Sequence, residues 1–308
     1  MRLEGLHHIT MITGDAQRTI DFYADVLGLR LVKATVNFDQ PEAYHLYFGD
    51  EAGSPGSILT WFEFRGAAPG RAGLGMVHRI ALAVPGEAAL DFWERRLAAH
   101  EVPAVREGES LRFADRDGLA LELVVHDIGA ELRATHPDVP VEHAITGVAG
   151  ARAYGAFHAV PDGVLTGLLG FDHESDGHYV LRGEQRHVHW TIDAAPDAHG
   201  QPGAGTVHHI AWASRDEDHA GWRQRIADGG GFVTEIIDRD YFDAIYFREP
   251  HGVLFEIATL GPGFATDEDA GHLGEELRLP KQHEHLRAQL DRQLTRIVNP
   301  RSGREVRA

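Results

Sequence analysis

The chain has 308 residues, of which 43% are hydrophobic and 25% charged, as in a globular protein large enough for two domains. Its formal net charge of −18 would repel phosphate backbones, so nucleic acid is excluded as an expected partner. The chain has no cysteine, so any metal must be bound by nitrogen and oxygen donors. It lacks an apolar run suited to a membrane span or a secretory signal, and we expect a cytoplasmic protein with no membrane partner.

One short motif, a histidine followed within two residues by an isoleucine, recurs along the chain at His8, His78, His143 and His209. Twelve residues after each of the first two histidines begins an apolar segment with helical spacing, IDFYADVLGL and LDFWERRLAA. A similar helix is expected near residues 222–226, whereas the pattern is degenerate at residues 163–171 in the third copy. Such self-similarity indicates a fold built from repeated units.

Each unit closes with apolar segments that a glycine-containing turn divides, such as LRFADRDGLALELVV and IYFREPHGVLFEIAT. Asp-Gly and Pro-His-Gly between alternating apolar residues are typical of β-hairpins. The sequence therefore predicts four βαβββ modules, at residues 5–64, 76–126, 141–193 and 206–260. We divide the chain into an N-terminal half with modules one and two, a C-terminal half with modules three and four, and a tail, at residues 1–138, 139–262 and 263–308.

The tail changes from an acidic segment to an apolar pattern of helical spacing. This pattern predicts an amphipathic helix that presents Leu286, Leu290, Leu294 and Ile297 on one face. We expect the tail to pack on the body of the chain or on a second subunit of a homo-oligomer, and we expect no chemistry from it.

Four βαβββ modules resemble the vicinal oxygen chelate superfamily, which includes glyoxalases, bleomycin resistance proteins and extradiol dioxygenases. Within it, five segments look like those of dioxygenases that cleave the ring of hydroquinones: GLHHIT, LGLRLVKATVNFD, YHLYFGD, TVHHIAW and DRDYFDAIYFREPHGVLFEIAT. The likeness covers nearly the whole chain, tail included. It implies an α+β fold in which modules one and four form one cup-shaped barrel and modules two and three another, with a C-terminal helix added.

The resemblance also implies a metal site. The family places its ligands on the second histidine of each His-His pair and on a glutamate of the last strand of module four, which here are His8, His209 and Glu256. Two imidazoles and one carboxylate form the facial triad of non-haem Fe(II) oxygenases, which leaves positions open for substrate and O₂. Fe(II) is therefore the implied cofactor, Mn(II) also suits such a site, and Zn or Ni are alternatives in a purified sample.

A position count separates this site from that of the glyoxalase-type members, which typically complete the coordination with a ligand from the partner module. Four residues after the turn glycine stands Glu256 in module four, Glu122 in module two and Thr60 in module one. Glu63 lies at an odd offset from Thr60 and faces away on an ideal strand. The count predicts an open site without a second carboxylate, which favours oxygen chemistry.

The family's pocket residues, carried over through the resemblance, are His7, Thr10, His208, Arg239 and Tyr246. Thr10 shares a strand face with His8, whereas alternation turns His7 and His208 away from the metal. Arg239 would hold the negative charge of a phenolate or of reduced oxygen, Tyr246 would donate a hydrogen bond, and His208 is a candidate acid or base.

The orientation of Tyr246 depends on the length of the turn that follows it. A four-residue turn would pair Ile245 with Glu256 and point Tyr246 outward. A five-residue turn, at residues 249–253, pairs Arg248 with Leu254 and sets Tyr246 against Glu256, on the metal's face. The local sequence suits either turn, and the functional interpretation predicts the longer one.

The expected function is an Fe(II)-dependent ring-cleaving dioxygenase whose partners are a small dihydroxylated aromatic substrate and O₂. The alternatives are a glyoxalase-like lyase or isomerase, and a non-enzymatic protein that sequesters an aromatic compound. Modules two and three offer a mirror set, His78, Glu122 and His143, which we interpret as a vestige of duplication rather than a second metal site. His187 and His189 share one strand face, and we assign them no role.

Overall fold

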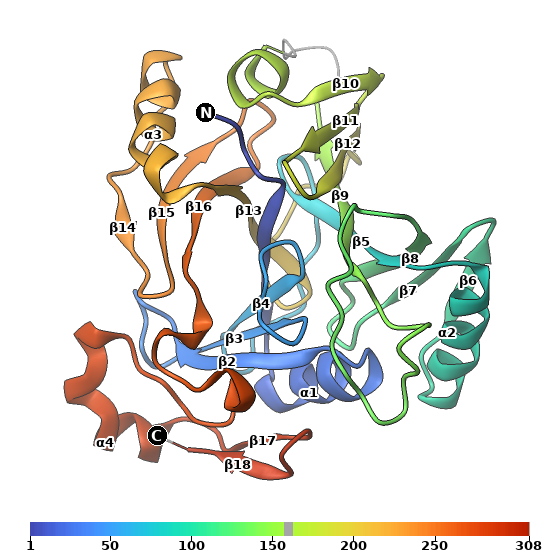
Figure 1. Cartoon of the computed structure of the whole chain (residues 1–308), viewed down its shortest axis with the longest axis vertical. Helices are drawn as coiled ribbons and strands as arrows, with labels where there is room; N and C mark the ends of the chain where they lie inside the picture. Colours follow the sequence, from blue (N-terminus) through green and yellow to red (C-terminus); the bar gives the residue numbers. More distant parts are fainter. Residues whose placement is uncertain (157–162, 308) are drawn as a thin grey trace.

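Two eight-stranded sheets dominate the computed structural model, which describes residues 1–156 and 163–307 (Figure 1). Residues 157–162 of the third module lie outside the described residues. The first sheet has the order β14-β15-β16-β13-β1-β4-β3-β2 and the second β10-β11-β12-β9-β5-β8-β7-β6. Each sheet curls into a cup, and in Figure 1 the cups stand side by side, with α3 flanking the first and α2 the second.

The first sheet joins modules one and four, as the resemblance implied. Its strands are β1 (Leu6–Thr13), β2 (Arg30–Val36), β3 (Tyr44–Gly49), β4 (Ile58–Glu63), β13 (Thr206–Ser214), β14 (Ile237–Asp238), β15 (Phe242–Arg248) and β16 (Leu254–Pro262). The two modules meet where β1 pairs antiparallel with β13. The expected pairing of modules one and four is therefore confirmed.

The second sheet joins modules two and three in the same way, with β5 antiparallel to β9. Its strands are β5 (Val77–Val84), β6 (Ala104–Glu107), β7 (Ser110–Ala114), β8 (Ala120–Val125), β9 (Gly147–Gly155), β10 (Asp172–Ser175), β11 (His178–Arg182) and β12 (His187–Ala194). Each sheet thus takes one module from each half of the chain. The division at residues 1–138, 139–262 and 263–308 follows the order of the modules along the chain. That these three parts are separate folding units stays a prediction.

One helical segment follows the first strand of every module. The helical segments of the described residues are α1 (Ala16–Ile20), η1 (Asp21–Val26), α2 (Glu87–Ala99), η2 (Val164–Leu169), η3 (Asp216–Asp218), α3 (His219–Asp228), η4 (Phe264–Thr266), η5 (Ala270–His272), η6 (Lys281–Leu286) and α4 (Arg287–Gln293). The described part of the degenerate third module has only the short η2, and η1 and η2 are π-helical. No helix among the described residues is long and apolar enough to cross a membrane.

The hydrophobic core lies between the sheets and under the helices, and the concave faces stay free to line cavities. Trp212 of β13, Trp190 of β12 and Phe255 of β16 meet edge to face where the sheets touch, with ring centroids 5.2–5.8 Å apart. All eight residues of β1 are buried, because one face packs in this core and the other lines the cup. The seam strands are therefore the most enclosed places in the fold.

The β15–β16 hairpin has the longer of the two turns considered above. Arg248 pairs with Leu254, and Tyr246 pairs with Glu256. The predicted five-residue turn at 249–253 is thus confirmed, and Tyr246 shares the concave face with Glu256 because directly opposed strand residues face the same side.

The tail packs on module one. Lys33 of β2, which is fully buried, donates to Asp267 at 2.6 Å and also pairs with Glu268. The predicted C-terminal helix is present as η6 and α4, but it ends before Leu294. Ile297 was wrongly placed on it, since this residue belongs to β17 (Ile297–Asn299), which pairs with β18 (Arg304–Val306). Ile297 is buried all the same, because the small sheet continues the apolar face of the helix.

The hairpin turn contains a buried carboxyl group, that of Glu249, which is 2% exposed. Its Oε1 accepts the Val253 N–H at 2.9 Å, while Oε2 has no partner within the described part of the chain. Burial raises the pKa of Glu249 from its ordinary 4.5 to about 7. The folded protein therefore binds more protons than the unfolded chain between these values, and the free energy of unfolding falls as the pH rises through this window.

We expect Glu249→Gln to remove this loss of stability at higher pH. The unfolding free energy of the variant, minus that of the unchanged protein, should grow by up to about 3 kcal/mol between pH 4.5 and 8. Urea unfolding over a series of pH values measures the difference, with the exposed Glu94→Gln as a control. A difference that does not vary with pH would contradict the raised pKa.

Candidate metal centre

Three predicted ligands, His8 of β1, His209 of β13 and Glu256 of β16, converge on the concave face of the first sheet. The Nε2 atoms of His8 and His209 lie 3.2 Å apart, and the Glu256 Oε2 lies 3.5 and 2.9 Å from them respectively. Ligand atoms about 2.0–2.2 Å from one ion, at octahedral or tetrahedral angles, lie roughly 2.8–3.6 Å apart. The observed spacing therefore fits one shared metal ion.

The carboxylate of Glu256 supplies an independent test of the fit. Its side chain is fully buried, and neither oxygen has a hydrogen bond of ordinary geometry within the described residues. Burial opposes ionisation, yet the two imidazoles hold the pKa of Glu256 well below its usual range. Burial lowers the pKa of His209. A buried carboxylate beside two imidazoles is the donor set that a divalent cation compensates.

The His-His pairs do not follow the alternation expected of ideal strands. The register between β1 and β13 shifts twice, so that His7 and His208 are each an extra residue in a β-bulge. The expectation that they turn away from the metal stays a prediction, and the bulges bring each of them against the ring of the histidine that follows it. The Nδ1 of His7 lies 2.9 Å from that of His8, and the Nδ1 of His208 lies 2.7 Å from that of His209.

These contacts set the tautomers of the two candidate ligands. His7 also hydrogen-bonds the backbone of Thr259, and burial lowers its pKa to about 3, so its ring is neutral. If the N–H of His7 donates to the backbone carbonyl of Thr259, the Nδ1 of His7 accepts a hydrogen bond from the Nδ1–H of His8. His8 then directs the lone pair of Nε2 into the site. Outer hydrogen bonds of this kind orient most metal-binding histidines.

The candidate ligands line a small enclosed cavity of about 30 Å³. Arg239 and Tyr246 also line it, whereas Thr10, His7 and His208 are not part of its wall. The Arg239 guanidinium lies 5.6 Å from the centre of the Tyr246 ring. Burial raises the pKa of Tyr246 well above its usual value, so its hydroxyl keeps its proton. Of the five predicted pocket residues, two therefore face the cavity directly.

A buried chain of hydrogen bonds that starts from two residues of the cavity wall, His45 and Tyr47, was missed from the sequence. Tyr47 donates to the Nδ1 of His45 at 2.9 Å, the His45 Nε2 lies 2.8 Å from the Thr60 hydroxyl, and Thr60 donates to Thr10. Burial lowers the pKa of His45 well below its usual value. The sequence does contain a sign of this chain, because His45 and Tyr47 are two residues apart and so lie on the same face of one strand.

The hydroxyl of Thr60 is thus engaged away from the candidate ligands. Glu63 is absent from the cavity wall and accepts the backbone N–H of Ala16 at the start of α1, at 3.1 Å. The place counted from the turn glycine therefore holds Thr60, and the carboxylate that module one contributes to the cavity wall, that of Asp39, is exposed.

The equivalent place in the second sheet has different residues. The matching register puts Arg79 where the first sheet has His8, and Gly150 where it has His209. Arg79 and Arg112 both pair with Glu122, at 3.7 and 3.2 Å, so a cationic side chain already compensates this carboxylate.

The mirror set does not assemble. His78 hydrogen-bonds Asp193 at 2.8 Å, and His143 stacks on Phe92 with a ring separation of 5.0 Å. Among the described residues, His78, Glu122 and His143 do not form a group with metal-binding spacing. Their interpretation as a vestige agrees with this arrangement.

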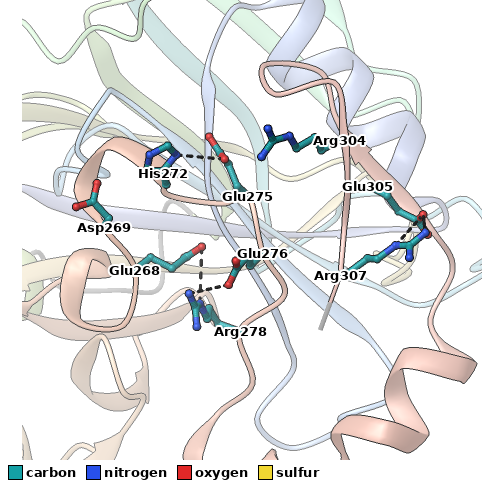
Figure 2. A pocket seen from close by; sticks show the side chains of 9 residues that line it. All are labelled: Glu268, Asp269, His272, Glu275, Glu276, Arg278, Arg304, Glu305 and Arg307. Carbon is teal, nitrogen blue, oxygen red and sulfur yellow. Dashed lines mark hydrogen bonds and ion pairs between the residues drawn. The ribbon is translucent and has the colours of Figure 1, made fainter.

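A much larger cavity, of about 600 Å³, lies away from the candidate ligands, where the acidic segment of the tail meets its C-terminal strand. Figure 2 shows that charged side chains surround it, several of them already paired, such as His272 with Glu275 and Arg307 with Glu305. It contains none of the predicted site residues, and its paired charges indicate a solvated crevice rather than a reaction centre.

Comparisons with known proteins agree with the fold. The model of the "Glyoxalase/Bleomycin resistance protein/Dioxygenase superfamily" matches residues 5–123 and 165–257. Over 298 residues, 94% of this chain and 95% of the relative, the chain is 45% identical to the Bacillus subtilis protein named "Putative ring-cleaving dioxygenase MhqO". It is 34% identical, over 94% of its length and 95% of the relative's, to a chlorohydroquinone/hydroquinone 1,2-dioxygenase from Sphingobium indicum.

Solved structures show the same architecture. A Bacillus subtilis protein described as a "putative dioxygenase" superposes with a TM-score of 0.89 at 42% identity, covering 97% of this chain and 98% of that one. Glyoxalase I from Zea mays shares the fold at a TM-score of 0.58 and 14% identity, over 83% of this chain and 92% of its own. The modules, their pairing and the relatives named as ring-cleaving dioxygenases lead to one conclusion: this chain belongs to the glyoxalase/bleomycin resistance protein/dioxygenase superfamily.

Proposed function

We propose that this protein is a non-haem Fe(II)-dependent dioxygenase of the extradiol type that opens a hydroquinone-like or related dihydroxylated aromatic ring with O₂. His8, His209 and Glu256 would hold the metal, and Fe(II), when bound, would supply electron transfer between an aromatic phenolate and O₂. The observation that carries the proposal is the spacing of these three donors around a carboxylate that has no other hydrogen-bonding partner.

The number of ligands favours oxygen chemistry over the glyoxalase-like alternative. Thr60 occupies the place at which a fourth protein ligand would stand, and its hydroxyl is engaged by His45 and Thr10. Three protein ligands on one face of the ion leave positions for both an aromatic oxygen and O₂. A lyase or isomerase that polarises one substrate has no need of so many free positions.

Arg239 and Tyr246 are the side chains that we assign to the substrate. The Arg239 guanidinium, which keeps its charge at any working pH, would balance the negative charge of a phenolate in a cavity that excludes water. The Tyr246 hydroxyl faces Glu256 across the hairpin and would donate a hydrogen bond to the substrate oxygen. Together they would bind and orient one ionised hydroxyl group of the ring.

His7, His208 and Thr10 are better assigned to positioning. His7 and His208 contact the Nδ1 atoms of the candidate ligands, and Thr10 ends the hydrogen-bonded chain from Tyr47. The acid or base role expected of His208 stays a prediction, since its ring reaches the site only through His209. Each of the three would fix the direction of a donor that binds metal or substrate.

The size of the cavity imposes a condition on the proposal. About 30 Å³ holds roughly one or two water molecules and no aromatic ring. Side chains at the mouth must therefore move when substrate enters. Phe38 and Arg239 are placed to do so, since the Arg239 guanidinium lies 5.4 Å from the Phe38 ring and 3.4 Å from the exposed carboxylate of Asp39.

We expect Glu256→Ala to lose the iron of this centre and the activity together. Removing the only carboxylate ligand should weaken Fe(II) binding by more than about 100-fold. Anaerobic metal analysis followed by oxygen uptake with a panel of hydroquinones and catechols measures both properties. Glu122→Ala, at the equivalent position of the second sheet, is the matched control and should keep both.

The same experiment separates the three candidate functions. A dioxygenase consumes one O₂ for each ring opened and needs no added reductant. A glyoxalase-like enzyme would bind metal and consume no O₂ with any diol, and a sequestering protein would bind the aromatic compound without metal. Full metal occupancy in Glu256→Ala would refute the assigned ligands.

We expect Tyr246→Phe to keep its metal and lose catalysis. Loss of a hydrogen bond to the reacting oxygen should lower kcat by about 100-fold or more, with a smaller change in KM. Steady-state oxygen uptake at matched iron content measures the effect. An unchanged kcat would mean that the hydroxyl does not act on the substrate. Arg239 alone would then balance the negative charge of the phenolate.

A further inference from the structure

The concave face of the second sheet carries a group of histidines that the proposed function does not use. His187 and His189 alternate onto one face of β12, and His178 of β11 lies on the same face because it pairs with Thr191. His126 follows β8 directly and continues the face of Glu122 and Val124. No local pattern links His126 to the other histidines, since it comes from module two and they come from module three.

Three of these histidines converge through the same ring atom. The Nε2 of His126 lies 3.0 Å from that of His189 and 3.2 Å from that of His187. Nitrogen ligands about 2.0–2.1 Å from a tetrahedral ion stand roughly 3.3 Å apart. The spacing matches that of His8 and His209 in the first sheet, which is 3.2 Å. Three imidazole nitrogens are thus arranged as they would be around one ion.

A hydrogen-bonded chain fixes the tautomer of the central ring. The Nδ1 of His178 lies 3.1 Å from the Thr191 hydroxyl, and its Nε2 lies 3.0 Å from the Nδ1 of His189. If His178 donates to Thr191, its Nε2 accepts from His189. The His189 Nε2 then presents a lone pair to His126. Such an outer hydrogen bond is the usual support of a metal-binding histidine.

Hydrogen bonds among the three rings cannot satisfy the cluster equally well. With the Nε2 of His189 acting as an acceptor, only His126 or His187 could supply a proton at the centre. If His126 supplied the proton, its one N–H would have to serve two acceptors. If His187 supplied it, the lone pairs of His126 and His189 would face each other at about 3 Å. A cation at the centre accepts all three lone pairs at once.

The surroundings leave room for a further ligand. His126 and His189 border a cavity of about 260 Å³, whose other walls include Val124, Ala149 and Ala151. All three histidines are partly exposed, so an ion has a path to them. Three protein ligands with an open fourth position are the arrangement found at catalytic rather than structural zinc sites.

We propose that His126, His187 and His189 bind a second divalent transition-metal ion, with Zn²⁺ as the preferred ion and an exchangeable ligand facing the cavity. His178 is the positioning residue of this site. The site is not a copy of the first centre, because Arg79 and Gly150 stand where that centre has its histidines. It is independent of the proposed dioxygenase activity.

The test titrates the metal-free full-length protein with Zn²⁺ by equilibrium dialysis, and with Co²⁺ by visible absorption. The unchanged protein should bind two equivalents, and Glu256→Ala should still bind one. In the Glu256→Ala background, His126→Ala should weaken that remaining equivalent by more than about 100-fold and abolish the tetrahedral Co²⁺ spectrum. His178→Phe should weaken it by about 10–100-fold, as expected for loss of an outer hydrogen bond.

Two controls keep the result decisive. His173→Ala removes an exposed histidine of neighbouring β10 and should leave the second equivalent unchanged. Should His126→Ala fold poorly by circular dichroism, His126→Asn and His189→Gln replace it. The proposal is overturned if Glu256→Ala binds no metal, or if changes at His126 and His189 leave the second equivalent intact. It is also overturned if Glu174→Gln alone removes that equivalent, since the ion would then lie between Glu174, His178 and His189, the other group with suitable spacing.

Discussion

A carboxylate buried without a hydrogen-bond donor is the constraint around which the first sheet is organised. Glu256 lies on β16, His209 on β13 and His8 on β1, three consecutive strands of one sheet. Burial of an uncompensated charge costs several kcal/mol, so the arrangement is stable only when a cation or a proton balances it. The three donors reach one point only because module four pairs with module one. The metal centre and the pairing of the modules therefore depend on each other.

The seam between paired modules has the same backbone irregularity in both sheets. In the first sheet the extra residues of the two bulges are His7 and His208, and in the second they are His78 and Ala149. The repeated modules therefore share a backbone framework and differ in side chains. Arg79 and Arg112 neutralise the buried glutamate of the second sheet, whereas the imidazoles of the first sheet leave Glu256 to a metal. The two sheets therefore differ in side chains on one framework.

Sequence reasoning succeeded where a pattern repeats or where loop length has only two outcomes. The four modules follow from periodicity. Tyr246 could be placed because each of the two turn lengths puts its side chain on a definite face of the sheet. It failed where the backbone departs from ideal geometry. The bulges at His7 and His208 leave no sign in the sequence, and the tail helix was extended to Ile297 because a short strand continues the same apolar face. His187 and His189 were noticed but given no role, because His126 comes from another module and no local spacing records such a contact.

The electrostatics of the first cavity are set by the few charges near it rather than by the net charge of the whole chain. The net charge of −18 argues against polyanionic partners, whose many phosphates sample the overall field. A small phenolate is governed by the charges within about 8 Å of it, because salt screens the more distant ones. There the fixed charges are the Arg239 guanidinium, Glu256 and any bound metal, with Asp39 in solvent at the mouth. The global charge that excludes nucleic acid is therefore compatible with a cavity that attracts a small anion.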